Sequence, residues 1–239
     1  MRTETAINVI NDTLFELGLI TAALANPYTS TNALAILSRY LLKALGQELV
    51  RKRQWTHLQK THIFNTANGV GDYALPTDFI GMVHSTEWNR TTGIPLSGPA
   101  GPRGWQVLKS STSGTGTPDY TYRVYANRLY LHETPTATET LVYEYQSAFW
   151  VLPSGQTVPT TEEPSASTDT LWFDKRLLVS GLKAKLLEQK GMDSSAARNE
   201  FEAALAEAAG DDGAHPVLSL SVPRATQRHP DFPLTGWGS

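Results

Sequence analysis

The stretch Gly71-Asp72-Tyr73-Ala74-Leu75-Pro76-Thr77-Asp78-Phe79-Ile80 lies where a helical pattern gives way to short strands. Pro76 disfavours both a helix interior and a central strand, and it restricts the preceding residue to extended geometry. Thr77 and Asp78 can fold their side-chain oxygens onto nearby amides. We therefore predict a rigid turn between two strands, although an ordinary strand corner has the same pattern. The residues that organise this turn are Tyr73, Leu75, Pro76, Asp78 and Phe79.

Two helices are predicted ahead of this turn. Residues from Thr3 to about Leu19 carry apolar side chains at helical spacing, and Gly18 is expected to end that helix. A second, longer helix is expected to begin at an N-cap formed by Ser30 or Thr31 and to run to about His57. Its wide apolar stripe predicts one buried face.

The pattern changes to short alternating strands from Thr61 to about Ala148. It predicts a compact antiparallel module, either a sandwich or a small barrel. Within it, the segment from Ser97 to Pro118 is rich in Gly, Pro and Ser, so we expect a long loop that contains Trp105.

Helical patterns return after a Pro-, Thr- and Ser-rich stretch. Asp174 opens a helix that reaches about Gln189, and Asp193 or Ser194 caps a fourth helix over Ala196–Ala209. The fold class expected is α+β: a bundle of four main helices with an inserted antiparallel β-module. The expected division is 1–60 (first helices), 61–153 (β-module), 154–172 (linker loop), 173–209 (last helices) and 210–239 (extended tail).

Residues 210–239, which we call the tail, have four prolines and no helical pattern. Ordering them costs roughly 1–2 kcal/mol per residue, whereas each buried large apolar side chain contributes roughly 1.5–3 kcal/mol. Burial within one subunit is therefore insufficient, and we predict that the tail docks into a neighbouring protein. A terminus that stays free is the alternative. The candidate docking residues are Val217, Leu218, Leu220, Val222, Phe232, Leu234 and Trp237.

Composition narrows the possible function classes. The 239 residues are 40% hydrophobic but only 18% charged, a low charge density for a free-standing soluble protein. A formal net charge of -3 implies no global attraction to nucleic acid or anionic membranes. The absence of cysteine excludes disulfides, thiolate zinc sites and a cysteine nucleophile. Because no signal peptide or membrane-spanning run is evident, no membrane partner is expected.

Catalytic and cofactor patterns are weak throughout. His57 and His62 straddle a predicted helix–strand boundary, which is poor geometry for a shared metal, and surface or helix-end roles explain them better. The run Gly114–Pro118 lacks the lysine and following helix of a phosphate-binding loop. The pair Glu162–Glu163 lies in the predicted linker, so we expect these carboxylates to be solvated and not to form a glycosidase dyad. The basic triplet Arg51–Arg53 is typical of a solvated helix end or an intersubunit ion pair. We predict no catalytic residue, no metal, no cofactor and no enzyme activity.

The β-module is rich in aromatic residues, which admits a second class of function. Such side chains could stack sugars, as in a monomeric carbohydrate-binding module, although alternating strands also place aromatics in a core. The residues concerned are Trp88, Trp105, Tyr120, Tyr122, Tyr125, Tyr130, Tyr143 and Tyr145.

The order of these parts resembles the tail-adaptor family of short-tailed and related bacteriophages. The resemblance covers roughly residues 1–209. It rests on a first helix ending in Leu17-Gly18, a long helix ending in Gln54-Trp55, and the Tyr73-x-Leu75-Pro76-x-Asp78-Phe79 turn. Further similar motifs are Trp88, the Gly116-x-Pro118 spacing before a Tyr-Arg-Val strand, Asn127-Arg128-Leu129-Tyr130-Leu131 with Pro135, and Leu141-Val142-Tyr143-Glu144-Tyr145.

The resemblance implies a head-to-tail connector at the portal vertex or neck of the virion. It implies a dodecameric homo-oligomeric ring beneath the portal protein, with double-stranded DNA passing through the lumen without specific binding. The tail would reach the portal, and the ring would present a platform for the next tail protein, a nozzle or tail tube. Another neck component, such as a stopper or nozzle-type tail tube protein, is the alternative within this class.

Overall fold

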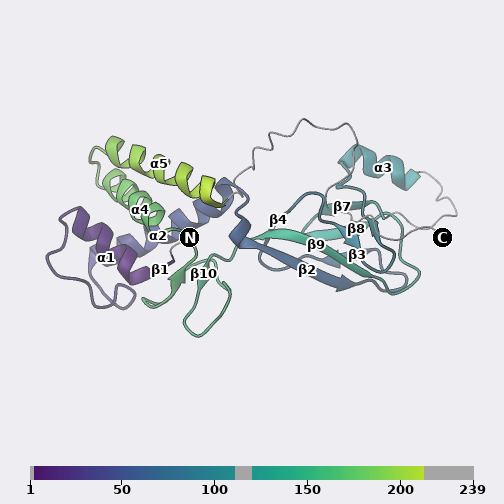
Figure 1. The fold of residues 1–239 in the computed structure, drawn as a ribbon, viewed down its shortest axis with the longest axis horizontal. Coiled ribbons are helices and arrows are strands. Elements are labelled where there is room, and N and C mark those ends of the chain that lie inside the picture. Colours follow the sequence, from purple (N-terminus) through teal and green to yellow (C-terminus); the bar gives the residue numbers. More distant parts are fainter. Residues whose placement is uncertain (1–2, 111–119, 213–239) are drawn as a thin grey trace, which may run out of the picture.

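The computed structural model describes residues 3–110 and 120–212. Two parts lie side by side along the long axis of the molecule, one helical and one built from strands (Figure 1). The chain is α+β and its paired strands are antiparallel, as predicted from the sequence. The helical part contains α1 (Ala6–Glu16), α2 (Ala33–Lys52), α4 (Lys175–Gln189) and α5 (Ser195–Asp212).

A small sheet belongs to the helical part, and its strands differ from three boundaries predicted from the sequence. It joins β1 (Glu4–Thr5), β11 (Thr170–Leu171) and β10 (Val151–Leu152). The first helix therefore starts at Ala6 rather than Thr3, because the residues before it pair with β11. Strand β10 belongs to the helical part instead of the β-module, and part of the predicted linker is a strand.

Local capping residues explain where three of the helices begin. Asn32, rather than Ser30 or Thr31, accepts the capping hydrogen bond of α2 from the Leu34 amide at 2.8 Å. Asp174 accepts from the Arg176 amide at 2.9 Å ahead of α4. Ahead of α5, Asp193 accepts from the Ser195 amide at 2.9 Å.

The helix ends differ more from the predicted ones. Gly18 adopts a left-handed φ of 63° after α1, which favours glycine. Helix α2 stops at Lys52 because Arg53 is extended, and the short 3-10 helix η1 (Thr56–Leu58) follows it. Helix α5 continues to Asp212, three residues beyond the predicted end at Ala209.

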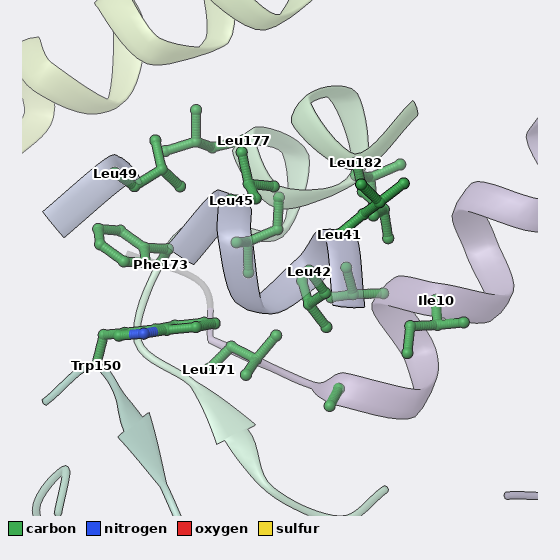
Figure 2. Packing of buried hydrophobic residues seen from close by; sticks show 14 of the residues in the cluster. Ile10, Leu41, Leu42, Leu45, Leu49, Trp150, Leu171, Phe173, Leu177 and Leu182 are labelled. Atoms are coloured by element: carbon green, nitrogen blue, oxygen red, sulfur yellow. The ribbon is translucent and has the colours of Figure 1, made fainter. Parts of the chain in front are cut away.

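One hydrophobic core unites the helical part. Trp150, Leu171 and Phe173 join side chains of α1, α2 and α4 in this core (Figure 2). Trp150 is fully buried, and its indole nitrogen donates to the Glu162 carbonyl at 2.6 Å. The indole lies directly against Gly46 of α2, where an added Cβ would overlap the ring. Gly46 therefore lets a large aromatic side chain approach the helix backbone closely.

The β-module comprises residues 59–147 and has its own core. One sheet has the order β2-β9-β5-β6, with β4 also paired to β9, and the other has the order β3-β8-β7. Both sheets contribute side chains to a single cluster, so they are packed as in a sandwich. The strands are β2 (Gln59–Asn65), β3 (Asp72–Ala74), β4 (Phe79–Met82), β5 (Trp88–Asn89), β6 (Ile94–Pro95), β7 (Tyr122–Tyr125), β8 (Arg128–Leu131) and β9 (Thr140–Ser147).

A helix occupies part of the segment predicted as a long loop. Helix α3 (Pro102–Ser110) lies on the β-module, away from the other helices (Figure 1). Its Trp105 is 7% exposed and packs edge-on to His132 with the ring centroids 6.1 Å apart. The His132 Nε2 is 2.7 Å from the Leu108 carbonyl oxygen, which ties the helix to the sheet. Burial of Trp105 thus stabilises a helix whose interior contains Gly104, a residue with low helix propensity.

The turn between β3 and β4, together with Tyr73 of β3 and Phe79 of β4, contains the five predicted organising residues. Leu75 and Asp78 are buried, and Tyr73 and Phe79 pack against the β-module core. The Phe79 amide donates to the Pro76 carbonyl at 3.1 Å, which closes the turn. The sequence predicted that the Asp78 side chain would bond to amides of the turn. The structure shows different partners for it. Charged and hydroxyl donors from β2 and β9 compete for it, because such bonds are stronger.

Asp78 accepts three hydrogen bonds from distant residues. Its carboxylate is 2.8 Å from Lys60 Nζ, 2.9 Å from Tyr145 Oη and 2.6 Å from Ser147 Oγ. The Asp78 carbonyl also accepts from the Ala148 amide at 2.7 Å. The turn is therefore fixed to the end of β9, where the chain leaves the β-module.

Candidate interaction site at the end of helix α5

The predicted docking residues of the tail all lie beyond the part of the chain that the structure describes. They are Val217, Leu218, Leu220, Val222, Phe232, Leu234 and Trp237. The structure does describe the residue from which the segment 213–239 continues, Asp212 at the end of α5. Residues 210–212, predicted to belong to the tail, are thus the last residues of α5, and the way Asp212 is held fixes the point from which residues 213–239 continue.

Asp212 is held by η1, the turn that connects α2 to β2. Its carboxylate accepts from the Thr56 amide at 2.8 Å and lies 2.8 Å from both Thr56 Oγ1 and His57 Nδ1. The Asp212 carbonyl also lies 2.9 Å from Thr56 Oγ1, so the single hydroxyl proton is donated to one of these two acceptors. The Asp212 side chain is only 7% exposed. We call Asp212 with Thr56, His57 and Arg53 the α5 clamp.

Arg53 completes the α5 clamp from the end of α2. Its guanidinium donates to the Ala209 carbonyl at 2.6 Å, and it lies over the Trp55 ring at 5.3 Å. The last carbonyls of a helix lack intrahelical donors, and a cation is favourable there. The sequence instead indicated a solvated helix end or an intersubunit pair for Arg51–Arg53. Within the described residues, Lys52 also bonds inside the subunit, 3.3 Å from Glu202.

His57 lies in η1, just after the end of α2, which agrees with the helix-end role expected, and its side chain is 18% exposed. Its ring lies between those of Trp55 and Phe173, with centroids 5.6 Å and 5.5 Å away. Because the carboxylate of Asp212 can only accept, Nδ1 carries the proton. The other nitrogen, Nε2, is buried without a hydrogen-bond partner among the described residues.

A small cavity of about 200 Å³ lies beside the α5 clamp. Trp55, Phe173 and Leu177 form its apolar wall, and Glu207 and Asp211 contribute acidic groups. Its size suits one side chain of a binding partner better than a cofactor. In the residues the structure covers, no group of three His, Asp or Glu side chains is spaced to hold a metal. Nor does any helix there have the length and apolar character needed to cross a membrane.

Asp212→Asn is expected to loosen the end of α5 and to destabilise the protein by about 1–3 kcal/mol, because hydrogen bonds to a charged acceptor are lost. Burial tends to raise the pKa of Asp212, but hydrogen bonds from His57 and Thr56 outweigh it and lower the pKa. This contribution is therefore present above the ordinary pKa of about 3.9 and is lost as the pH falls through the lower folded value.

Urea unfolding at pH 7 and hydrogen exchange of the last turn of α5 measure this effect. Asp211→Asn is the matched control, since the neighbouring aspartate is exposed. Equal stability of the two variants, or equal exchange in the last turn, would contradict a clamp.

The sequence did not identify the α5 clamp, although it contains one signal. Asp211 and Asp212 end a helix at its negative pole, where carboxylates are unfavourable without a partner. That pattern indicates that a hydrogen-bond donor from another part of the chain contacts these carboxylates. The donors, His57 and Thr56, lie 155 and 156 residues earlier in the chain, so local sequence does not identify them.

The aromatic residues of the β-module lie mostly in its core. Tyr120, Tyr122, Tyr143 and Tyr145 are each no more than 5% exposed, and burial raises the pKa of all four hydroxyls. Tyr122 donates to the buried Glu87 at 2.6 Å. These rings are covered by neighbouring side chains, so they offer no face on which a sugar could stack.

Comparison with known proteins identifies the family of the chain. No curated protein matches the chain. Residues 10–224, most of the sequence, match the family described as SU10 adaptor protein. The chain therefore belongs to the SU10 adaptor family and is a structural adaptor protein of a bacteriophage.

Proposed function

We propose that this adaptor forms a ring beneath the portal at the neck of the virion, extends the DNA channel and provides the platform for tail attachment. Membership of the SU10 adaptor family supports this proposal. The observation that carries it furthest is the α5 clamp, because it gives residues 213–239 a fixed origin on the folded subunit. The ring is a dodecamer, in keeping with the resemblance noted from the sequence.

The tail docks into the portal protein through its apolar residues. Leu218, Leu220 and Val222 alternate with serines, a pattern that suits strand addition to an exposed sheet edge. A segment tethered at a fixed point has a high effective concentration at a nearby partner, so docking from a clamped helix is favoured over docking from a loose one. Ring closure brings several such tails to the portal together, which raises avidity.

Double-stranded DNA passes through the lumen without specific binding. Strong phosphate contacts would retard sliding, since each one adds salt-dependent affinity. The contacts of Lys52 with Glu202 and of Arg53 with the Ala209 carbonyl support this proposal. Because these two cations are bound within the subunit, they are less available for contacts with DNA phosphates. The next tail protein, a nozzle or tail tube, attaches on the side opposite the portal.

Removing residues 213–239 is expected to abolish attachment to the portal and to leave the fold intact. The variant ending at Asp212 keeps the α5 clamp, so its thermal unfolding should match that of the full chain. Attachment is measured by mixing each protein with portal rings and imaging the particles by electron microscopy. Decoration by the full chain but not by the shortened one is the expected result.

Two substituted chains refine this test. Leu218→Ser with Leu220→Ser and Val222→Ser should prevent decoration, whereas Ser219→Ala with Ser221→Ala should preserve it. Decoration by the chain ending at Asp212 would overturn docking through the tail, and failure of the full chain to decorate the portal would favour a stopper or nozzle-type role.

A further inference from the structure

A groove on the outer face of the β3-β8-β7 sheet combines cationic and aromatic side chains. Its volume is about 420 Å³, and its lining residues belong to α3 and the β7–β8 hairpin. Figure 1 shows that these elements are distant from the helical part. Helix α3 contributes one wall and the hairpin contributes the other. The lining residues are Trp105, Gln106, Lys109, Arg123, Tyr125 and Tyr130.

The register of the hairpin places three of these side chains on one face. Arg123 and Tyr130 are directly paired across β7 and β8, and Tyr125 follows two residues after Arg123. The rings of Tyr125 and Tyr130 are 5.7 Å apart and tilted by 40°. Tyr125 is 56% exposed, so much of its ring is open to a ligand.

Both cations of the groove rest on aromatic rings instead of carboxylates. Lys109 Nζ lies 5.5 Å from the Trp105 ring, and Arg123 Cζ lies 5.1 Å from the Tyr125 ring. Neither forms an ion pair with a carboxylate of the described residues. The neighbouring Arg128, by contrast, is paired to Asp72 at 2.5 Å. The groove therefore has two positive charges that are positioned but not neutralised by this part of the chain.

These observations decide among three kinds of anionic ligand. An acidic sugar needs an open aromatic face, whereas Trp105 is only 7% exposed and the guanidinium of Arg123 occupies part of the exposed Tyr125 ring. A nucleic acid strand needs a run of cations along its phosphates, whereas this groove offers two. An acidic protein segment needs one or two carboxylate partners and an apolar surface beside them. The Tyr125–Tyr130 pair supplies that surface.

The geometry points to a docking site for an extended acidic segment of another protein, with one or two carboxylates on Lys109 and Arg123 and an apolar side chain against Tyr125 and Tyr130. Charge complementarity identifies this occupant. That the segment belongs to the next protein of the phage tail rests on the proposed function, whereas the binding chemistry does not.

Two synthetic peptides test the site. One is a fluorescein-labelled decapeptide that alternates Glu and Leu and contains one central Tyr, and the other has Gln in place of every Glu. Fluorescence anisotropy with the full chain at low salt is expected to show binding at least tenfold tighter for the Glu peptide. Arg123→Gln and Lys109→Gln should each weaken it about two- to fivefold, and the double variant should lose it.

Arg103→Gln is the matched control, because Arg103 is exposed on the same helix but does not line the groove. It should leave the affinity unchanged, and circular dichroism should show that all variants remain folded. Equal affinity for the two peptides, or equal loss in the control, overturns the proposal. Preferential binding of a fluorescein-labelled oligothymidine overturns it in favour of a nucleic acid site. The portal-decoration experiment has a separate readout, so failure of one does not imply failure of the other.

Discussion

Replacing Gly46 with alanine is expected to destabilise the protein by about 2 kcal/mol or more. An added Cβ at this position would overlap the indole of Trp150, which is fully buried and held by its bond to the Glu162 carbonyl. Overpacking a core site costs about 1–3 kcal/mol, and occasionally more. The greater helix propensity of alanine offsets no more than about 1 kcal/mol of this. Urea unfolding followed by tryptophan fluorescence and circular dichroism measures the change.

Gly210→Ala is the matched control for this substitution. Gly210 also lies in a helix, but no described atom is within 4 Å of the added Cβ, so about 0.5–1 kcal/mol of stabilisation is expected. In the background of Trp150→Leu, the cost of Gly46→Ala should shrink, since the overlapping ring is gone. A cost that stays the same in that background would show that the close approach of Trp150 is not its cause.

Asp78→Asn is expected to cost about 3 kcal/mol, because it removes the charge that Lys60, Tyr145 and Ser147 surround. The Asp78 residue is 5% exposed, so water cannot replace the lost partner. Lys60 would keep the Pro159 carbonyl at 3.2 Å as an acceptor but would lose its counter-ion. Chemical unfolding at pH 7 provides the measurement.

The pH dependence of this variant supplies a second readout. Burial tends to raise the pKa of Asp78, but hydrogen bonds from Lys60, Ser147 and Tyr145 outweigh it and lower the pKa below its ordinary value. The wild-type chain should therefore lose stability as the pH falls below about 5 and through the folded pKa, and Asp78→Asn should lose less. Asp72→Asn is the control, because its exposed pair with Arg128 is worth about 1 kcal/mol at most. Parallel pH profiles for wild type and Asp78→Asn would refute this assignment.

The features that the sequence predicted well depend on nearby residues. Asp174 caps α4 because its side chain reaches an amide two residues ahead, and that preference is visible in the sequence. The change from helical to alternating periodicity likewise depends on local spacing, so the order of helices and strands was predictable.

The features that the sequence missed depend on partners far along the chain. Strand β1 forms because Glu4 and Thr5 pair with Leu171 and Thr170, which no local pattern reveals. Helix α3 depends on the burial of Trp105 against His132, although Pro102 at its first position is a start signal that was available. The α5 clamp was hidden for the same reason, since Thr56 and Asp212 are 156 residues apart.

The two ends of the β-module are neighbours. Gln59 at the start of β2 pairs directly with Gln146 near the end of β9, so the chain leaves the helical part and returns to it at almost the same place. An inserted domain whose two ends are adjacent can be shortened, lengthened or exchanged without rearranging the domain into which it is inserted. The β-module is therefore joined to the rest of the subunit through a single neck of two adjacent chain segments, so a change in its size leaves the path of the helical part unchanged.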